Sequence, residues 1–246
     1  MLLTLMYHQV INDKFPNGID YLDQHFSYLH ENFSVVVPGE ILSDSKKSVC
    51  LTFDDAYFDF YYKVYPLLKK HNLKAVLAIP VKFILDDTDV EPENRLTVPY
   101  AAAMDDSIYD NFAPFCTWKE IREMVDSGHV IAASHSYNHV NLTNTNVDLT
   151  QELTHSKKII TEKTGKPVEV FVYPFGRMNR AIQRRAQKDY QYVFRIGSAL
   201  NFSWNNCHGS TYRIDADHFW PTNKKFTRKD YIKFTIKLLS NTLRGR

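Results

Sequence analysis

Short apolar runs alternate with stretches of helical periodicity along most of this 246-residue chain. The runs are rich in β-branched and aromatic residues, which favour strands. They occupy residues 2–7, 49–53, 75–79, 130–134, 168–173 and 192–196. Strands that alternate with helices in this way predict βα units and a parallel sheet. We therefore predict an α/β fold, a single distorted (β/α)7 barrel that resembles a TIM barrel and is incompletely closed.

Helix signals fill the gaps between these runs. Thr117 and Glu120 form a capping box at the start of a helix that should end near Gly128. Two further helices are predicted over 58–71 and 147–164. The stretch 82–116 is long, acidic in its first half and poor in periodicity, so we expect an excursion over one end of the barrel that contacts the substrate. The barrel domain is expected to span residues 1–221.

Residues 222–246 differ from the rest in charge. They hold eight Lys or Arg against Asp230, although the whole chain has a net charge of only +2. A basic amphipathic helix is predicted here, with Ile232, Ile236, Leu239 and Leu243 on one side and Lys229, Lys233 and Lys237 elsewhere. This helix either packs its apolar side on the barrel or makes peripheral contact with an anionic membrane. A basic stripe interleaved with aromatics is missing from the main body, so nucleic-acid binding is not expected.

Cysteine usage and the N-terminal residues point to a cytoplasmic protein. Cys50, Cys116 and Cys207 are far apart and form no CxxC pair, so free thiols are expected. Residues 1–8 lack the basic and apolar regions of a secretory signal, and no apolar run approaches the length of a membrane span. Unless a leader has been removed, the expected location is the cytoplasm, with peripheral contact to the inner membrane face as the alternative. Oligomeric state is left open.

Two segments that follow strands carry groups suited to a metal. Asp54 and Asp55 come after the run 49–53, and His135 and His139 come after the run 130–134. Carboxyl ends of parallel strands open on one face of a barrel, so these segments can meet. An Asp pair after a strand is more often a helix cap, and an HxxxH pair is as often a solvated helix face as a ligand pair. Together they predict a two-His, one-carboxylate site for metal-assisted hydrolysis, the two histidines aligned by a helical turn.

These residues resemble the polysaccharide deacetylases with a NodB homology domain, carbohydrate esterase family 4, in their exopolysaccharide-deacetylase-like branch. Thr52-Phe53-Asp54-Asp55-Ala56 is similar to the motif TFDDG, and 135–139 to H(S/T)xxH. Tyr173-Pro174-Phe175-Gly176 is similar to the third motif. The resemblance implies Asp54 as catalytic base and Asp55, His135 and His139 as ligands of a divalent metal, zinc first, with cobalt or nickel as alternatives.

The match departs from the family pattern at three places. The Gly after the two aspartates is Ala56, which resists a positive φ. The usual Arg partner of the base is replaced by Val172, and Arg177 or Arg213 are the candidates to substitute. No LxH segment supplies the general acid. His208 is assigned that role by position, and His218 is the other candidate.

The resulting hypothesis is hydrolysis of N-acetyl groups on an amino sugar of a polysaccharide or its precursor. Backbone N–H groups at Tyr57 or Phe175 are expected to hold the oxyanion. Substrate contacts are assigned to Tyr57, Tyr173, Pro174, Phe175, His8 and Arg213. Two alternatives remain: a deacylase or deformylase of a lipid-linked sugar at the inner membrane leaflet, and a carbohydrate-binding relative without catalysis. A non-haem iron oxygenase would use the same ligand types but lacks this resemblance.

Overall fold

Seven parallel strands form a closed ring in the computed structural model, which describes residues 1–10, 18–206, 209–217 and 225–244. Neighbours around the ring are β1 (Leu2–Tyr7), β3 (Ser48–Phe53), β4 (Ala75–Ile79), β5 (Val130–Ser134), β6 (Val170–Val172), β7 (Tyr192–Ile196) and β8 (Thr211–Asp215). β1 closes the ring by pairing with both β3 and β8. The predicted (β/α)7 barrel is confirmed, but the expectation of incomplete closure is wrong. Strand pairing is shortest between β5 and β6, which are joined by the single residue pair Ser134 and Phe171.

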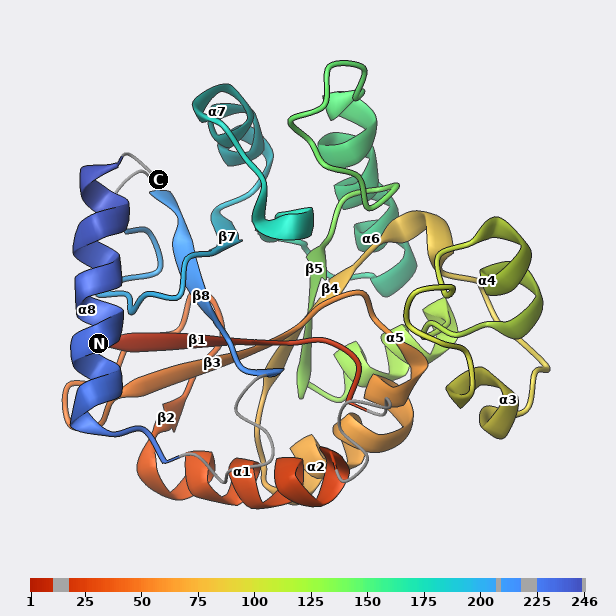
Figure 1. Ribbon diagram of the computed structural model, residues 1–246. Helices are drawn as coiled ribbons and strands as arrows, with labels where there is room; N and C mark the ends of the chain where they lie inside the picture. The colour runs from red at the N-terminus through yellow and green to blue at the C-terminus, as the bar shows by residue number, and fades with distance from the viewer. Residues whose placement is uncertain (11–17, 207–208, 218–224, 245–246) are drawn as a thin grey trace.

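Helices surround this ring (Figure 1). They are α1 (Gly18–Asn32), α2 (Tyr65–Lys70), α3 (Pro92–Leu96), α4 (Asp106–Phe112), α5 (Trp118–Asp126), α6 (Ser156–Thr164), α7 (Arg180–Asp189) and α8 (Arg228–Leu243). π-helical turns, η1 (Phe60–Val64) and η3 (Thr150–His155), lead into α2 and α6, and 3-10 turns form η2 (Val81–Phe83) and η4 (Pro174–Gly176). The two-residue β2 (Ser34–Val35) pairs with the start of β3.

Two apolar clusters follow the alternate faces of the strands. The larger one joins strand residues such as Leu51 and Leu77 to helix residues such as Phe26 and Ile121, so it lies between the ring and the helices. The smaller one takes the alternate strand positions and contains no helix residue, so it fills the inside of the ring. Burial on both faces explains why the strands read as continuous apolar runs rather than as alternating patterns.

Three helices lie where the capping residues and helical periodicity predicted them. Thr117 accepts a hydrogen bond from the Glu120 amide while Glu120 accepts one from the Thr117 amide, which is the predicted capping box of α5. The helices predicted over 58–71 and 147–164 are observed as η1 with α2 and as η3 with α6. The second of these ends at Gly165, whose φ of 70° gives the left-handed cap.

The excursion over 82–116 is anchored by a buried arginine. Arg95 on α3 donates to the carbonyls of Ala113 and Phe115 and to both carboxylate oxygens of Glu120, with closest distances of 2.7 Å. Its guanidinium also lies 3.5 Å from the centre of the Phe58 ring. These contacts tie the excursion to α5 and to the segment after β3, and they bring its aromatic residues toward the ends of the strands.

Helix α8 packs on the barrel with a different side from the one predicted. Phe234 and Leu238 are buried, and the carbonyl of Phe234 accepts from the amide of Leu200. The predicted contact side is exposed: Ile232, Ile236, Leu239 and Leu243 have 51%, 60%, 60% and 86% of their surface accessible. The prediction failed because Tyr231, Phe234 and Leu238 form a second apolar stripe, and the rings of Tyr231 and Phe234 pack against Phe226. Within the described residues, no helix has both the length and the apolar character needed to cross a membrane.

Candidate metal and catalytic site

Polar side chains gather where the strands end. Asp54 and Asp55 follow β3, His135 follows β5, and His8 follows β1. Parallel strands in a closed ring present their carboxyl ends on one face, so residues far apart in the chain meet there. The site is therefore a consequence of the barrel, which places three separate polar segments on one rim.

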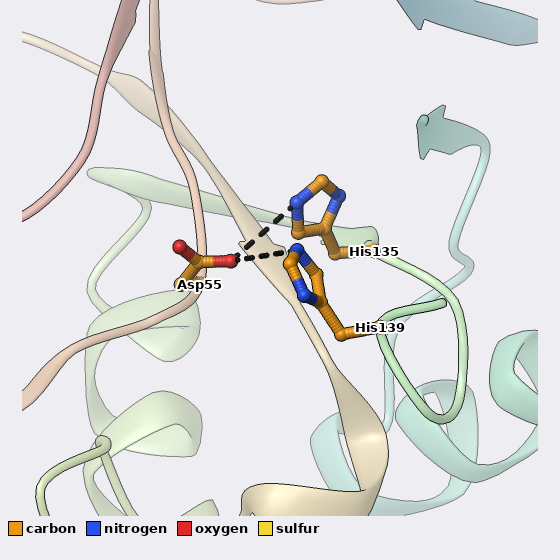
Figure 2. Close-up of side chains that lie close together, drawn as sticks. All are labelled: Asp55, His135 and His139. Carbon is orange, nitrogen blue, oxygen red and sulfur yellow. Dashed lines mark ion pairs between the residues drawn. The ribbon is translucent and has the colours of Figure 1, made fainter. Parts of the chain in front are cut away.

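Asp55, His135 and His139 form a compact cluster (Figure 2). Their nearest ligand atoms all lie within 4.8 Å of one another. Asp55 Oδ1 lies 3.5 Å from His135 Nε2 and 3.2 Å from His139 Nε2. His135 Nδ1 lies 2.8 Å from the carbonyl oxygen of Val172, which fixes Nδ1 as the protonated nitrogen and leaves the lone pair on Nε2.

The histidine segment is a turn and not the helical turn expected from the HxxxH spacing. Ser136 and His139 have positive φ values of 68° and 53°. The amide of His139 donates to Ser136 Oγ at 3.1 Å, which closes the turn. Asp55 and Ala56 also have positive φ values, 70° and 54°. Ala56 therefore adopts the backbone conformation that glycine adopts without strain, at a cost on the order of 1 kcal/mol.

The three side chains fit a divalent metal of the zinc type. Burial lowers the pKa of His135 and of His139 to about 4, so both imidazoles are neutral at pH 7. Asp55 Oδ1 is buried and has no hydrogen-bond partner among the described residues, and it faces both Nε2 atoms. An orphaned carboxylate oxygen opposite two imidazole lone pairs is a costly arrangement unless a cation completes it.

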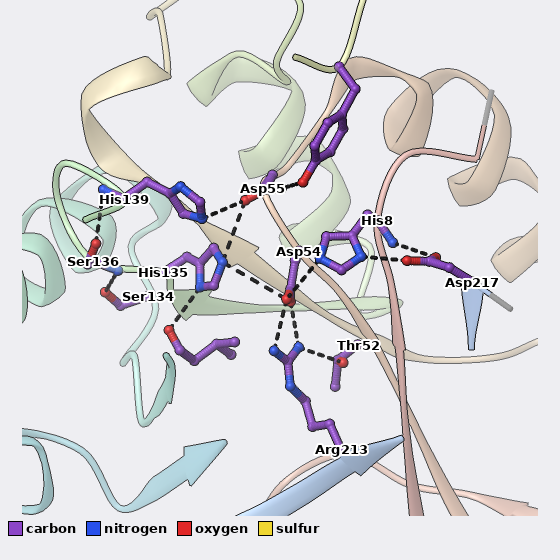
Figure 3. A network of polar contacts seen from close by, with 12 residues as sticks. His8, Thr52, Asp54, Asp55, Ser134, His135, Ser136, His139, Arg213 and Asp217 are labelled. Carbon is purple, nitrogen blue, oxygen red and sulfur yellow. Dashed lines mark hydrogen bonds and ion pairs between the residues drawn. The ribbon is translucent and has the colours of Figure 1, made fainter. Parts of the chain in front are cut away.

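Asp54 has a different environment from its neighbour. Arg213 donates to it through both terminal nitrogens, Nη1 to Oδ1 at 2.6 Å and Nη2 to Oδ2 at 2.8 Å (Figure 3). The Arg213 side chain is fully buried and also donates to Thr52 Oγ1. Burial opposes ionisation of Asp54, but the charge of Arg213, with smaller effects from His135 and His8, holds its pKa well below the usual range. Asp54 is therefore an ionised carboxylate beside the cluster. Of the two arginines proposed to replace the missing partner, Arg213 is the one that contacts Asp54.

His8 faces the same carboxylate from β1. Its Nε2 lies 3.7 Å from Asp54 Oδ2, and its Nδ1 lies 2.6 Å from Asp217 Oδ2. Asp217 also accepts from the backbone amide of His8 at 3.1 Å. Burial alone would lower the pKa of His8, but the hydrogen bond to Asp217 and the charge of Asp54 outweigh it and raise the pKa to about 9. His8 is therefore protonated at pH 7, and its Nε2–H is on the side of Asp54.

The residues assigned to substrate contact divide into exposed and buried groups. Phe175 is 57% exposed, and its ring lies 4.8 Å from that of His139, so it forms a wall beside the cluster. His8 is partly exposed at the same rim. The remaining four, Tyr57, Tyr173, Pro174 and Arg213, are buried. Arg213 is occupied by Asp54, and the Tyr173 hydroxyl donates to Gln183, so neither side chain presents a surface to solvent.

The residue chosen by position as general acid, His208, lies outside the described residues, as does His218. Asp217, the partner of His8, was missed by the sequence analysis, although it lies only two residues after β8. Tyr100 was also missed. Its hydroxyl donates to Asp55 Oδ2 at 3.4 Å, and its ring centre lies 5.2 Å from that of Tyr57, with the two planes tilted by 36°. Tyr100 lies in the stretch 82–116, and the predicted excursion of that stretch over the strand ends was the sequence feature that could have identified it.

Glu152 holds the turn between the two histidines. It is buried in η3, and its carboxylate accepts from the amides of Tyr137 and Asn138, both at 2.9 Å, and from the Asn138 side chain at 2.7 Å. Three donors on one carboxylate leave the turn little freedom. Support of this kind around metal ligands commonly changes metal affinity when it is removed.

Replacing Glu152 by Ala should weaken the affinity of the cluster for an added divalent metal by about 10- to 100-fold, because His139 is no longer held in register with Asp55. Competition with a chromophoric chelator measures this affinity. Glu162→Ala is the matched control, since Glu162 is exposed on α6, which η3 leads into. Equal affinities for the two variants would show that the turn keeps its shape without Glu152.

Comparisons with known proteins identify the family of this chain. The family profile described as polysaccharide deacetylase matches residues 42–194, more than half of the chain. The chain belongs to the polysaccharide deacetylase family. The Bacillus subtilis protein YxkH is 26% identical over 199 residues, which are 76% of this chain and 61% of that protein.

Two further relatives extend the comparison. The poly-beta-1,6-N-acetyl-D-glucosamine N-deacetylase of Escherichia coli K12 is 27% identical over 216 residues, 73% of this chain and 30% of that protein. The chain thus spans less than two thirds of the length of either curated relative. A solved de-N-acetylase from Aggregatibacter actinomycetemcomitans has the same fold, with a TM-score of 0.67 at 24% identity over 94% of this chain and 98% of that one.

Proposed function

We propose that this family member removes N-acetyl groups from an amino sugar of a polysaccharide or of its precursor, with a divalent metal held by Asp55, His135 and His139. The main support is the position of Asp55 Oδ1: it is buried, has no hydrogen-bond partner among the described residues, and faces two neutral imidazoles beside an ionised Asp54. Two nitrogens and one carboxylate oxygen favour zinc, with cobalt and nickel as alternatives. When bound, the metal supplies a Lewis acid that polarises the acetamide carbonyl and acidifies a water.

The protein's own groups divide the remaining work. Asp54, kept ionised by Arg213, takes the proton of the attacking water as general base. His8, kept protonated by Asp217, gives a proton to the amine nitrogen as the C–N bond breaks, so that acetate and a free amine leave. His8 replaces the positional choice of His208 in this scheme. The exposed ring of Phe175 offers the apolar wall against which a sugar ring packs.

The decisive experiment measures acetate and amine release from a panel of N-acetylhexosamine polymers, oligomers, nucleotide sugars and lipid-linked sugars. Metal-stripped protein is assayed with zinc, cobalt or nickel added back, beside His139→Ala as the metal-site control. Metal-dependent release that His139→Ala loses is the expected result, and the panel names the substrate class. Metal binding without release from any substrate would instead favour a carbohydrate-binding relative, and release from lipid-linked sugars alone would favour a deacylase at a membrane.

His8 also makes a pH-dependent contribution to stability. Its pKa is raised from 6.5 to about 9 in the folded protein, so the stabilisation is fully present below pH 6.5 and is lost as the pH rises toward 9. In metal-free protein, the difference in free energy of unfolding between wild type and His8→Gln should shrink across that window. Urea titrations in a chelating buffer check this. His30→Gln, at an exposed site on α1, controls for loss of any histidine, and a difference that does not change with pH would contradict the assignment.

A further inference from the structure

The outward side of α8 carries a line of exposed apolar residues. Ile232, Ile236, Leu239 and Leu243 are spaced four, three and four positions apart, which places them on one side of a helix. We call these four residues the outer stripe. Each is more than half exposed. Four large aliphatic side chains on one line are unusual on a surface that meets only water.

The outer stripe lies opposite the packed side of the same helix. Residues two positions apart on a helix of 3.6 residues per turn point in nearly opposite directions. Ile232 and Ile236 each precede a packed residue, Phe234 and Leu238, by two positions. The packing side is fully engaged, because the Phe234 carbonyl accepts from Leu200 and the Asn241 amide donates to the Gly197 carbonyl at 3.0 Å. The stripe is therefore free to contact a second surface without disturbing the barrel.

Charge identifies the chemistry of that surface. Lys229, Lys233, Lys237 and Arg244 are exposed and follow the stripe along one flank, and Arg228 is exposed near its start. The helix contains one acid, Asp230, which is buried and bonded to the Thr227 hydroxyl at 2.7 Å. An apolar stripe flanked by cations alone matches an anionic lipid surface, where aliphatic side chains enter the acyl boundary and lysines meet the headgroups.

A second copy of this chain fits the same side poorly. A two-fold interface brings the same patch of both copies together, so it would place these cations against each other without an exposed acid on α8 to pair with them. We propose that the outer stripe of α8 and its flanking lysines form a docking surface for an anionic membrane.

The docking surface leaves the proposed site open. The start of α8 lies near the amino end of β3, since Lys47, just before that strand, stacks over the Tyr231 ring at 4.7 Å. Figure 1 likewise shows α8 beside the start of β1, whereas the metal cluster follows the carboxyl ends of the strands. A protein held through α8 therefore presents its cluster away from the lipid, toward a substrate that extends into the aqueous phase.

Flotation of the full chain with vesicles tests the proposal. The probes are vesicles of pure phosphatidylcholine and of phosphatidylcholine mixed with phosphatidylglycerol. We expect at least about tenfold tighter binding to the anionic vesicles, weakened by salt. Ile236→Gln/Leu239→Gln and Lys233→Gln/Lys237→Gln should each abolish that binding. All four side chains are exposed, and Gln is a good helix former, so folding should be retained and is checked by thermal melting.

Matched controls remove the same kinds of side chain elsewhere. Phe112→Gln on α4 removes another exposed apolar residue, and Lys158→Gln on α6 removes another exposed lysine. Both should bind anionic vesicles like the wild type. Failure of the wild type to bind, or equal binding by the stripe variants, would overturn the proposal. A dimer in light scattering that Ile236→Gln/Leu239→Gln dissociates, without vesicle binding, would assign the stripe to self-association instead and would also overturn it.

Discussion

Asp54→Asn should lower the turnover of the metal-loaded protein by about two to four orders of magnitude. The substitution keeps the shape of the side chain but removes the negative charge that accepts a proton. Metal affinity should change little, because Asp54 Oδ2 lies 4.0 Å from His135 Nε2 and both Asp54 oxygens are engaged by Arg213, whereas Asp55 Oδ1 faces the two imidazoles at 3.2 and 3.5 Å. Single-turnover assays and metal titrations measure the two effects separately.

The neighbouring replacement Asp55→Asn is the matched control for this experiment. It makes the same chemical change one residue further along, but it alters the carboxylate of the metal cluster. Asp55→Asn should lose metal affinity first and turnover as a consequence. If Asp54→Asn retained near-full turnover, Asp54 would not be the base. If both variants lost metal equally, the division of roles between the two aspartates would be wrong.

Arg213→Met should destabilise the protein by about 3–5 kcal/mol, because it leaves the buried Asp54 carboxylate without its cation. For a protein of this size that loss lowers the melting temperature by roughly 10 °C. The side chain of Arg213 is fully buried and that of Asp54 nearly so, which makes solvent a poor substitute for either partner. Urea unfolding and calorimetry on metal-free protein measure the change.

A double-mutant cycle separates the pair from simple loss of packing. Asp54→Asn/Arg213→Met removes both charges. The double variant should therefore lose less free energy of unfolding than the two single variants lose when their losses are added. Arg185→Met on α7 is the surface control: Arg185 pairs with Asp189 one turn later, at a partly exposed site, and should cost less than about 1 kcal/mol. Additive effects of the two buried substitutions would show that Asp54 and Arg213 do not stabilise each other.

Much of the barrel and of the cluster follows from local sequence signals. Burial on both faces makes six strands read as apolar runs, and capping residues mark the helix ends, so these elements were predicted in place. β8 escaped detection because Thr211–Asp215 contains Arg213, whose charge interrupts the apolar pattern. Asp55, His135 and His139 were chosen because carboxyl ends of parallel strands meet on one rim, and the structure brings them together.

The sequence alone did not determine which residues pair when they lie far apart in the chain. The motifs and the strand pattern specify which polar groups reach the rim, because those depend on residues close together in the chain. Which partner each group meets depends on the closed ring, which brings Arg213 to Asp54 across 159 positions and Asp217 to His8 across 209. The same holds for α8, where two apolar stripes were available and only the shape of the barrel surface decided which one was buried. Periodicity identifies an amphipathic helix, but packing against the rest of the fold determines its orientation.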